Sequence, residues 1–330
     1  MNGVVSYLCV GLFLFSFPYV SSGQVVEFSI AIHGGAGIEP SKLTAAEQEL
    51  HKLALMRALE TGREILANKG TALDAVEKTI RVLENEPLYN AGHGAVFNNM
   101  GQHELDAAIV DGKSRRAGAV AGVTTIKNPI SLARMVMTET EHVLLMGLGA
   151  EKFADELKNQ PHIERVANSY FSTEHRRREW QEIVEQEKQA KSSKIGKGTV
   201  GCVARDSHGN LAAGTSTGGL TNKKWGRVGA VPIVGAGTFA DNETLAMSGT
   251  GIGEDFILNS VGFHLHALMK YRALSLAEAV DDVLHHVLKE DKGGVIAIDA
   301  KGTIVMGCNT PGMARASVDS TGQTEILLAR

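Results

Sequence analysis

The sequence is poor in cysteine, in aromatic residues and in clustered positive charge. Its 330 residues include 3 cysteines, which excludes a disulfide scaffold. Cys202 and Cys308 could pair if they were adjacent, but two buried thiols are the favoured interpretation. No cysteine or histidine spacing is typical of a zinc site. The net charge of −4 comes without a basic stripe, so we expect no nucleic-acid partner.

Long apolar runs are also missing, except at the N-terminus. A mostly apolar stretch from Tyr7 to Val20 precedes Ser21-Ser22-Gly23, and the first charged residue is Glu27. This pattern predicts a signal peptide over residues 1–23, although no Lys or Arg precedes the apolar stretch. The run is short for a membrane-spanning helix, and no later segment is longer. We therefore expect a secreted, periplasmic or luminal protein with no membrane contact once the leader is removed.

Glycine is abundant: 37 glycines among 330 residues are about 11%, against roughly 7% in an average protein. Many tight turns are therefore expected between short apolar strands. Several strands pair through hairpin sequences such as Asp206-Ser207-His208-Gly209-Asn210. Antiparallel sheets covered by helices, an α+β fold, are therefore predicted. The strands are expected at residues 28–33, 105–110, 117–124, 199–205, 211–217, 295–298, 304–306 and 325–328. The helices are expected at 44–70, 71–83, 128–140, 175–191, 254–271 and 275–289.

Two glycine-rich loops suggest chemistry that their surroundings do not favour. The segment Gly214-Thr215-Ser216-Thr217-Gly218 matches the nucleophile elbow of lipase-like hydrolases. An elbow needs a helix directly after its serine, whereas the following residues are turn-rich. Gly249-Thr250-Gly251-Ile252-Gly253 lacks the third glycine of a dinucleotide fingerprint. As a strand-to-helix turn, however, it can present free N–H groups to an anion or oxyanion.

A different nucleophile is suggested at Gly198-Thr199. A polar, linker-like stretch over 191–198 leads directly into a threonine that begins an apolar strand. Cleavage before Thr199 would give this residue a free α-amine, so that one residue supplies both nucleophile and base. A preceding glycine suits such a cleavage because it tolerates strained backbone geometry.

Motifs spread over nearly the whole chain resemble those of the plant-type asparaginase and isoaspartyl aminopeptidase family of N-terminal-nucleophile hydrolases. They keep the family's order and spacing. They are Ile32-His33-Gly34-Gly35-Ala36-Gly37, Pro87-Leu88-Tyr89-Asn90-Ala91-Gly92, Glu104-Leu105-Asp106-Ala107, 117–123, Asn128-Pro129, Gly198-Thr199-Val200-Gly201, Thr215-Ser216-Thr217-Gly218-Gly219, Gly226-Arg227-Val228-Gly229 and Gly235-Ala236-Gly237.

This resemblance implies a four-layer αββα sandwich and a precursor that cuts itself between Gly198 and Thr199. The products would be an α chain of residues 24–198 and a β chain of residues 199–330, forming one catalytic domain. Two such units would assemble into an (αβ)2 heterotetramer. The implied reaction is hydrolysis of L-asparagine and β-aspartyl (isoaspartyl) dipeptides with release of L-aspartate. No cofactor is implied.

The resemblance also implies roles for matching residues. Thr199 would be the nucleophile, Thr217 would hydrogen-bond beside it, and Asn90 would lie next to it. Thr250 and the backbone N–H of Gly251 would form the oxyanion hole. The residues implied to bind substrate are Arg227, for the α-carboxylate, with Ala230, Thr250, Gly251, Ile252 and Gly253. A structural sodium would be held by the backbone carbonyls of Leu83, Glu84, Glu86, Tyr89, Ala91 and His93.

One residue departs from the family pattern. Ala230 stands where the family has an aspartate that binds the substrate α-ammonium. Loss of that charge-assisted hydrogen bond would cost roughly 1.5–3 kcal/mol. Three interpretations stay open: weak activity on free asparagine and isoaspartyl peptides, a substrate without a free α-amine, or an engineered change or sequence artefact at this position. A rival function of another class is a secreted binding protein with impaired turnover. Nearby, Trp225 is expected to pack in the interior.

Overall fold

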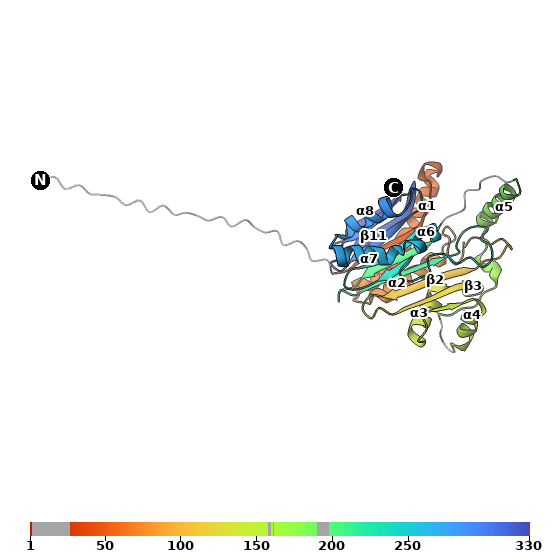
Figure 1. Ribbon diagram of the computed structural model, residues 1–330, viewed down its shortest axis with the longest axis horizontal. Helices are drawn as coiled ribbons and strands as arrows, with labels where there is room; N and C mark the ends of the chain where they lie inside the picture. Colours follow the sequence, from red (N-terminus) through yellow and green to blue (C-terminus); the bar gives the residue numbers. More distant parts are fainter. Residues whose placement is uncertain (2–26, 158–159, 161, 190–197) are drawn as a thin grey trace.

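The computed structural model describes residues 1, 27–157, 160, 162–189 and 198–330 (Figure 1). The predicted signal peptide, apart from Met1, and residues 191–197 of the predicted linker lie outside this description. Among the described residues, no helix is long and apolar enough to cross a membrane.

Two β-sheets form the centre of the fold. Among the described strands of the larger sheet, β3 and β4 pair in parallel and the other neighbours are antiparallel. Its strands, in spatial order, are β12 (Thr324–Ala329), β11 (Gly312–Asp319), β1 (Ser29–Ala36), β5 (Val200–Arg205), β6 (Leu211–Thr217), β2 (Leu105–Asp111), β3 (Ala117–Val123) and β4 (Leu144–Met146). The smaller sheet is antiparallel, with the order β10 (Ile304–Cys308), β9 (Gly293–Asp299), β8 (Leu245–Gly251) and β7 (Thr238–Ala240).

Helices cover the outer face of each sheet (Figure 1). On the larger sheet these are α1 (Ala45–Ala67), α2 (Ala72–Glu84) and α3 (Pro129–Glu139). On the smaller sheet they are α7 (Val261–Arg272) and α8 (Leu276–Asp282), with α6 (Gly253–Leu258) and a π-helical turn at Val283–Val287 beside them. The remaining helical elements are α4 (Gly147–Glu156), α5 (Glu174–Lys188) and two 3-10 turns, Pro40–Lys42 and Asn168–Phe171.

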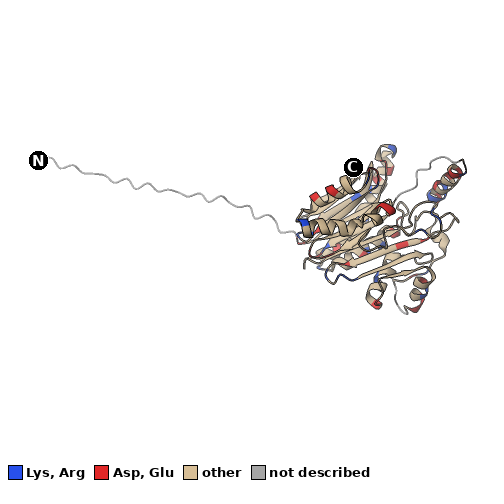
Figure 2. Ribbon diagram, in the orientation of Figure 1, with Lys and Arg blue, Asp and Glu red and all other residues tan. Residues whose placement is uncertain are grey.

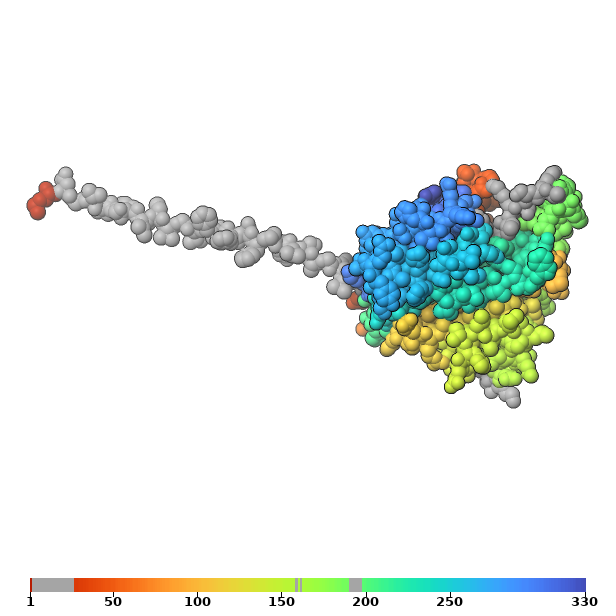
Figure 3. Space-filling model, viewed as in Figure 1, coloured from red at the N-terminus to blue at the C-terminus, as the bar shows by residue number. Residues whose placement is uncertain are grey.

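Three apolar clusters fill the spaces between these layers. One lies between α1–α3 and the larger sheet, one between the two sheets, and one between the smaller sheet and α7–α8. This confirms the predicted four-layer αββα sandwich. Charged residues lie largely on the helices, whereas the strands between the layers carry few (Figure 2). In Figure 3 the described segments before and after the predicted cleavage position form one continuous body.

Local sequence signals explain where the helices begin. Thr44 and Glu47 form a reciprocal capping box at the start of α1, as their spacing predicts. Thr71 accepts a hydrogen bond from the Asp74 N–H at the start of α2. Asn128 precedes α3, whose first residue is a proline.

Some sequence predictions were wrong. The helix expected over 254–271 is two helices, because Ser260 adopts a left-handed backbone with φ of 46°. Strands β4, β7, β8 and β11 were not predicted. In β11 the buried residues include Arg315 and Ser317, so this strand lacks the apolar pattern from which it could have been predicted. Trp225 is 96% exposed rather than packed inside. The two thiols, Cys202 and Cys308, are buried and unpaired, as favoured.

Candidate active site

The hydroxyl of Thr199 lies at the junction of the two sheets. Thr199 directly precedes β5, the strand held between β1 and β6 in the larger sheet, and it is 6% exposed. Its Oγ1 lies 3.1 Å from Thr217 Oγ1, at the end of β6, and 2.5 Å from the Gly198 carbonyl oxygen. The Gly219 N–H donates to Thr217 Oγ1 at 3.0 Å. The threonine hydroxyl is therefore held against the carbonyl of the peptide bond that precedes it.

Two donors reach the Gly198 carbonyl oxygen from outside that peptide. Asn90 Nδ2 donates to it at 3.1 Å and to the Gly219 carbonyl at 2.8 Å, while Asn90 Oδ1 accepts from the Val96 N–H. Thr217 Oγ1 also lies 3.3 Å from the Gly198 oxygen. Such donors stabilise negative charge that develops on a carbonyl oxygen. Gly198 has φ of 154°, and a Cβ there would meet Asn90 Cβ at 3.0 Å.

The carbonyl of Thr199 is held by a buried column of polar side chains that crosses between the sheets. His33 Nδ1 lies 3.0 Å from the Thr199 oxygen, and His33 Nε2 lies 2.9 Å from Ser248 Oγ. Ser248 Oγ is 2.7 Å from Thr215 Oγ1, to which Thr238 Oγ1 donates at 2.7 Å. Burial lowers the pKa of His33 to about 4, so its ring is neutral at pH 7.

Most of this column was not predicted from the sequence. His33 is part of the family motif at 32–37, but nothing in the sequence marks Ser248 or Thr238 as its partners. The residue Ser216 of the elbow-like motif is also explained here: its Oγ donates to Glu84 Oε1 at 2.7 Å and it is fully buried. Ser216 is therefore a structural residue rather than a nucleophile.

A small pocket, called the acyl pocket below, adjoins Thr199. Its lining joins the ends of β5, β6 and β8 to the loop between β6 and β7. The lining includes the predicted site residues Gly198, Thr199, Thr217, Arg227, Ala230, Thr250, Gly251 and Gly253. Asn90 contacts Gly198 from the loop after α2, and Ile252 follows directly on β8. The pocket holds only about 20 Å³, the space of one water molecule.

One charged side chain lines the acyl pocket, and it is already paired. Arg227 donates from Nε and Nη2 to the two carboxylate oxygens of Glu254, at 2.9 and 2.8 Å. This hydrogen bonding lowers the pKa of Glu254. Ala230 presents only a methyl group to the pocket, so the lining itself carries no anion. An incoming carboxylate would have to compete with Glu254 for the guanidinium.

Thr250 reaches the pocket from the smaller sheet. Its Oγ1 accepts a hydrogen bond from the Ala36 N–H at 3.0 Å, which ties β8 to the end of β1. Gly251 has φ of 144°, and a Cβ there would lie 2.1 Å from the Lys292 carbonyl oxygen. Only glycine fits at this position, so the turn from β8 into α6 depends on it.

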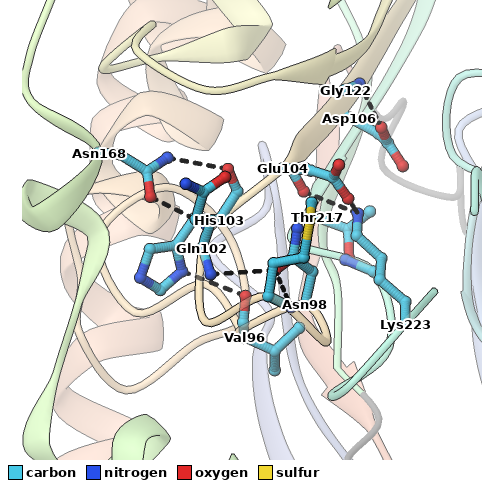
Figure 4. A network of polar contacts seen from close by, with 12 residues as sticks. Val96, Asn98, Gln102, His103, Glu104, Asp106, Gly122, Asn168, Thr217 and Lys223 are labelled. Atoms are coloured by element: carbon cyan, nitrogen blue, oxygen red, sulfur yellow. Dashed lines mark hydrogen bonds and ion pairs between the residues drawn. The ribbon is translucent and has the colours of Figure 1, made fainter. Parts of the chain in front are cut away.

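A second polar cluster lies beside Thr217 (Figure 4). Asp106 on β2 pairs in register with Thr217 on β6, and its Oδ1 accepts from the Gly122 N–H at 2.9 Å. Burial raises the pKa of Asp106. Lys223, whose side chain is 2% exposed, donates to the Glu104 carbonyl at 2.8 Å. Nothing in the sequence predicted this buried position for Lys223.

The threonine at the start of a central strand, inside an αββα sandwich, defines an N-terminal-nucleophile hydrolase fold. Comparison with known proteins agrees: the family model for asparaginase matches residues 26–328. The chain belongs to this asparaginase family. It is 46% identical over 297 residues to an isoaspartyl peptidase of Escherichia coli, covering 87% of this chain and 91% of the relative.

Two eukaryotic relatives have similar coverage. A probable isoaspartyl peptidase/L-asparaginase 2 of Arabidopsis thaliana is 41% identical, with 91% of this chain and 98% of the relative covered. An isoaspartyl peptidase/L-asparaginase of Mus musculus is 40% identical, with 91% of each covered. The family expected from the sequence motifs is therefore confirmed.

The neutral, buried His33 makes stability depend on pH. Its pKa falls from 6.5 to about 4 on folding, so the unfolded chain binds the proton more readily. The resulting stability is complete above pH 6.5 and is lost as the pH falls through 4, by about 3 kcal/mol in total. Between pH 6.5 and 4, we expect the free energy of unfolding of His33→Gln to fall by about 3 kcal/mol less than that of the wild type, as measured by denaturant titration. Parallel profiles for the two proteins would contradict this.

Proposed function

We propose that the chain cuts itself between Gly198 and Thr199 and that the mature protein hydrolyses L-asparagine and β-aspartyl dipeptides. The observation that carries the proposal is the placement of Thr199 Oγ1 against the Gly198 carbonyl, with Asn90 and Thr217 beside its oxygen. The names of the relatives support the substrate class, because they are isoaspartyl peptidases or combined isoaspartyl peptidase/L-asparaginases.

The self-cleavage step follows from this arrangement. Thr199 Oγ1 attacks the Gly198 carbonyl carbon, and Asn90 Nδ2 stabilises the oxyanion that forms. Collapse breaks the C–N bond and leaves Gly198 as an ester on Oγ1, with the Thr199 nitrogen protonated as a free amine. Water then hydrolyses the ester to release the Gly198 carboxylate. Removal of Gly198 opens the acyl pocket, which is too small for asparagine while the bond is intact.

The mature site is proposed to work by acyl transfer. The Thr199 α-amine takes the proton from Oγ1, which attacks the side-chain carbonyl of the aspartyl group. Thr250 and the Gly251 N–H stabilise the oxyanion, and Thr217 keeps the hydroxyl in place. Arg227 exchanges Glu254 for the substrate α-carboxylate in a bidentate pair. Ile252 and Gly253 lie along the substrate backbone. The α-ammonium then protonates the leaving group. Water hydrolyses the aspartyl ester, which releases L-aspartate.

A structural sodium is proposed in the loop that carries Asn90. Two of the carbonyl oxygens lie close to glycines of this loop: a Cβ on Gly92 would lie 2.3 Å from the Glu84 oxygen, and one on Gly94 would lie 2.7 Å from the Tyr89 oxygen. Hard cations prefer such oxygen ligands. The carbonyls of the proposed set are those of Leu83, Glu84, Glu86, Tyr89, Ala91 and His93.

The self-cleavage is tested with Thr199→Ala. We expect the wild-type protein to give two fragments on a denaturing gel, with the smaller one beginning at Thr199. The variant is expected to stay as one chain, because alanine has no hydroxyl to attack the Gly198 carbonyl. Thr199→Ser, which keeps a hydroxyl, is the matched control and is expected to cleave. N-terminal sequencing of the larger fragment also tests the proposed leader, since export would leave a start near residue 24. A wild-type chain that stays intact would overturn the proposal.

Ala230 determines how well the substrate α-ammonium is bound. We expect Ala230→Asp to raise kcat/KM for L-asparagine by roughly tenfold or more, because a carboxylate would supply a charge-assisted hydrogen bond. Nα-acetyl-asparagine is the control substrate, since it carries no α-ammonium and should gain nothing.

Two outcomes would change this assignment. A wild-type enzyme that prefers the acetylated substrate would favour aspartyl derivatives without a free α-amine. Self-cleavage with no turnover of either substrate would favour the binding-protein interpretation.

An (αβ)2 assembly is also proposed. The edge of the larger sheet at β4 exposes several large apolar side chains, which would be covered by a second copy. They are Val143, Leu144, Met146 and Leu148, the last at 85% exposure. Light scattering is expected to give twice the mass of one αβ unit, and Leu148→Asp is expected to weaken the assembly. A wild-type particle with the mass of a single unit would contradict the proposal.

A further inference from the structure

A second cavity meets the acyl pocket at Gly198. It has a volume of about 300 Å³, far larger than the acyl pocket. The end of β1 and the segment that follows it form one wall, and α1, the loop before Asn90, α5 and Ala314 of β11 contribute the rest. Gly198 alone, among the described residues, lines both spaces. Withdrawal of Gly198 would therefore join them beside Thr199.

The chemistry of amide hydrolysis places the leaving group on this side. The departing nitrogen must receive a proton, and the base that took the Thr199 hydroxyl proton is the Thr199 α-amine. The leaving nitrogen must therefore lie within hydrogen-bonding distance of that amine. A Cβ on Gly35 would lie 3.0 Å from the Thr199 nitrogen and 2.8 Å from Gly198 Cα. The wall of the second cavity thus reaches the position where proton transfer takes place.

The lining of the second cavity suits an amino acid or peptide. Leu43 and Leu88 are apolar. Arg176 is 8% exposed and is held in place by donating Nε to the Gly94 carbonyl at 2.9 Å and Nη1 to Glu179 at 2.8 Å. Lys42, paired with Glu39 at 2.6 Å, lies at the same wall. An α-carboxylate and an apolar side chain are the groups that such a lining recognises.

We propose that the second cavity is the leaving-group subsite, which takes the α-amino acid or peptide released from a β-aspartyl substrate and binds its carboxylate at Arg176. The proposal rests on the function proposed above. It separates the two substrate types physically, because L-asparagine releases ammonia, which fills none of this space. Dipeptide hydrolysis should depend on the second cavity, and asparagine hydrolysis should not.

Filling the cavity tests this directly. Leu43→Trp places a large side chain into it, whereas Leu50→Trp, on the exposed face of α1, is the matched control. For matured Leu43→Trp we expect kcat/KM for β-aspartyl-leucine to fall about tenfold or more, mainly through KM, with L-asparagine changed less than twofold. The control should change neither. Equal losses on both substrates, or no loss on the dipeptide, would overturn the subsite. A wild-type enzyme inactive on both substrates would instead overturn the proposed function.

The carboxylate contact is tested without altering the protein. With wild-type enzyme, β-aspartyl-leucinamide is expected to have about tenfold lower kcat/KM than β-aspartyl-leucine, because the neutral amide cannot form the charge-assisted pair with Arg176. Equal kcat/KM for the two substrates would show that Arg176 does not bind the carboxylate.

Discussion

The contact between Thr199 Oγ1 and the Gly198 carbonyl is the interaction on which the site depends. A hydroxyl beside its own preceding carbonyl is useful only if neither group can move away. The larger sheet fixes Thr199, because β5 is hydrogen-bonded on both sides. His33 holds the Thr199 carbonyl, and Asn90 holds the Gly198 carbonyl. Two of these restraints come from the larger sheet, through the β5 ladder and His33 on β1, and the third comes from the loop after α2, so sheet and loop together position the Gly198–Thr199 peptide.

This dependence explains why His33 is buried without charge. A protonated ring would have to be desolvated between the sheets with no carboxylate partner, and its lowered pKa reflects that cost. As a neutral ring it donates from Nδ1 to the Thr199 carbonyl and accepts at Nε2 from the Ser248 hydroxyl, so it forms a bridge between the two. The column therefore couples the larger sheet to β8, the strand that carries Thr250.

The sequence predicted features that depend on a few neighbouring residues, but it did not predict the polar column between the sheets. Caps such as Thr44 with Glu47 and hairpins such as 206–210 act over a few residues, so their patterns predict structure directly. The motif around Thr199 was recognisable because several family segments kept their order. The pairing of His33 with Ser248 spans 215 positions and follows from how two sheets pack. Likewise, the break between α6 and α7 could not be predicted, because the residue with the left-handed backbone is Ser260 rather than a glycine.

Charge around the acyl pocket explains why Ala230 matters to this chain. Arg227 and Glu254 neutralise each other, so the uncut pocket has little net field. If a substrate carboxylate binds Arg227 as proposed, Glu254 loses this partner; 52% of its side chain is already exposed, so water can solvate it. Glu254 directly follows the turn that is proposed to bind substrate, while the methyl of Ala230 contributes nothing to an ammonium. Under this proposal, binding of the α-carboxylate and binding of the α-amine would be unequal in the pocket. The first would have a bidentate cation, and the second would have only the anion that the first displaces.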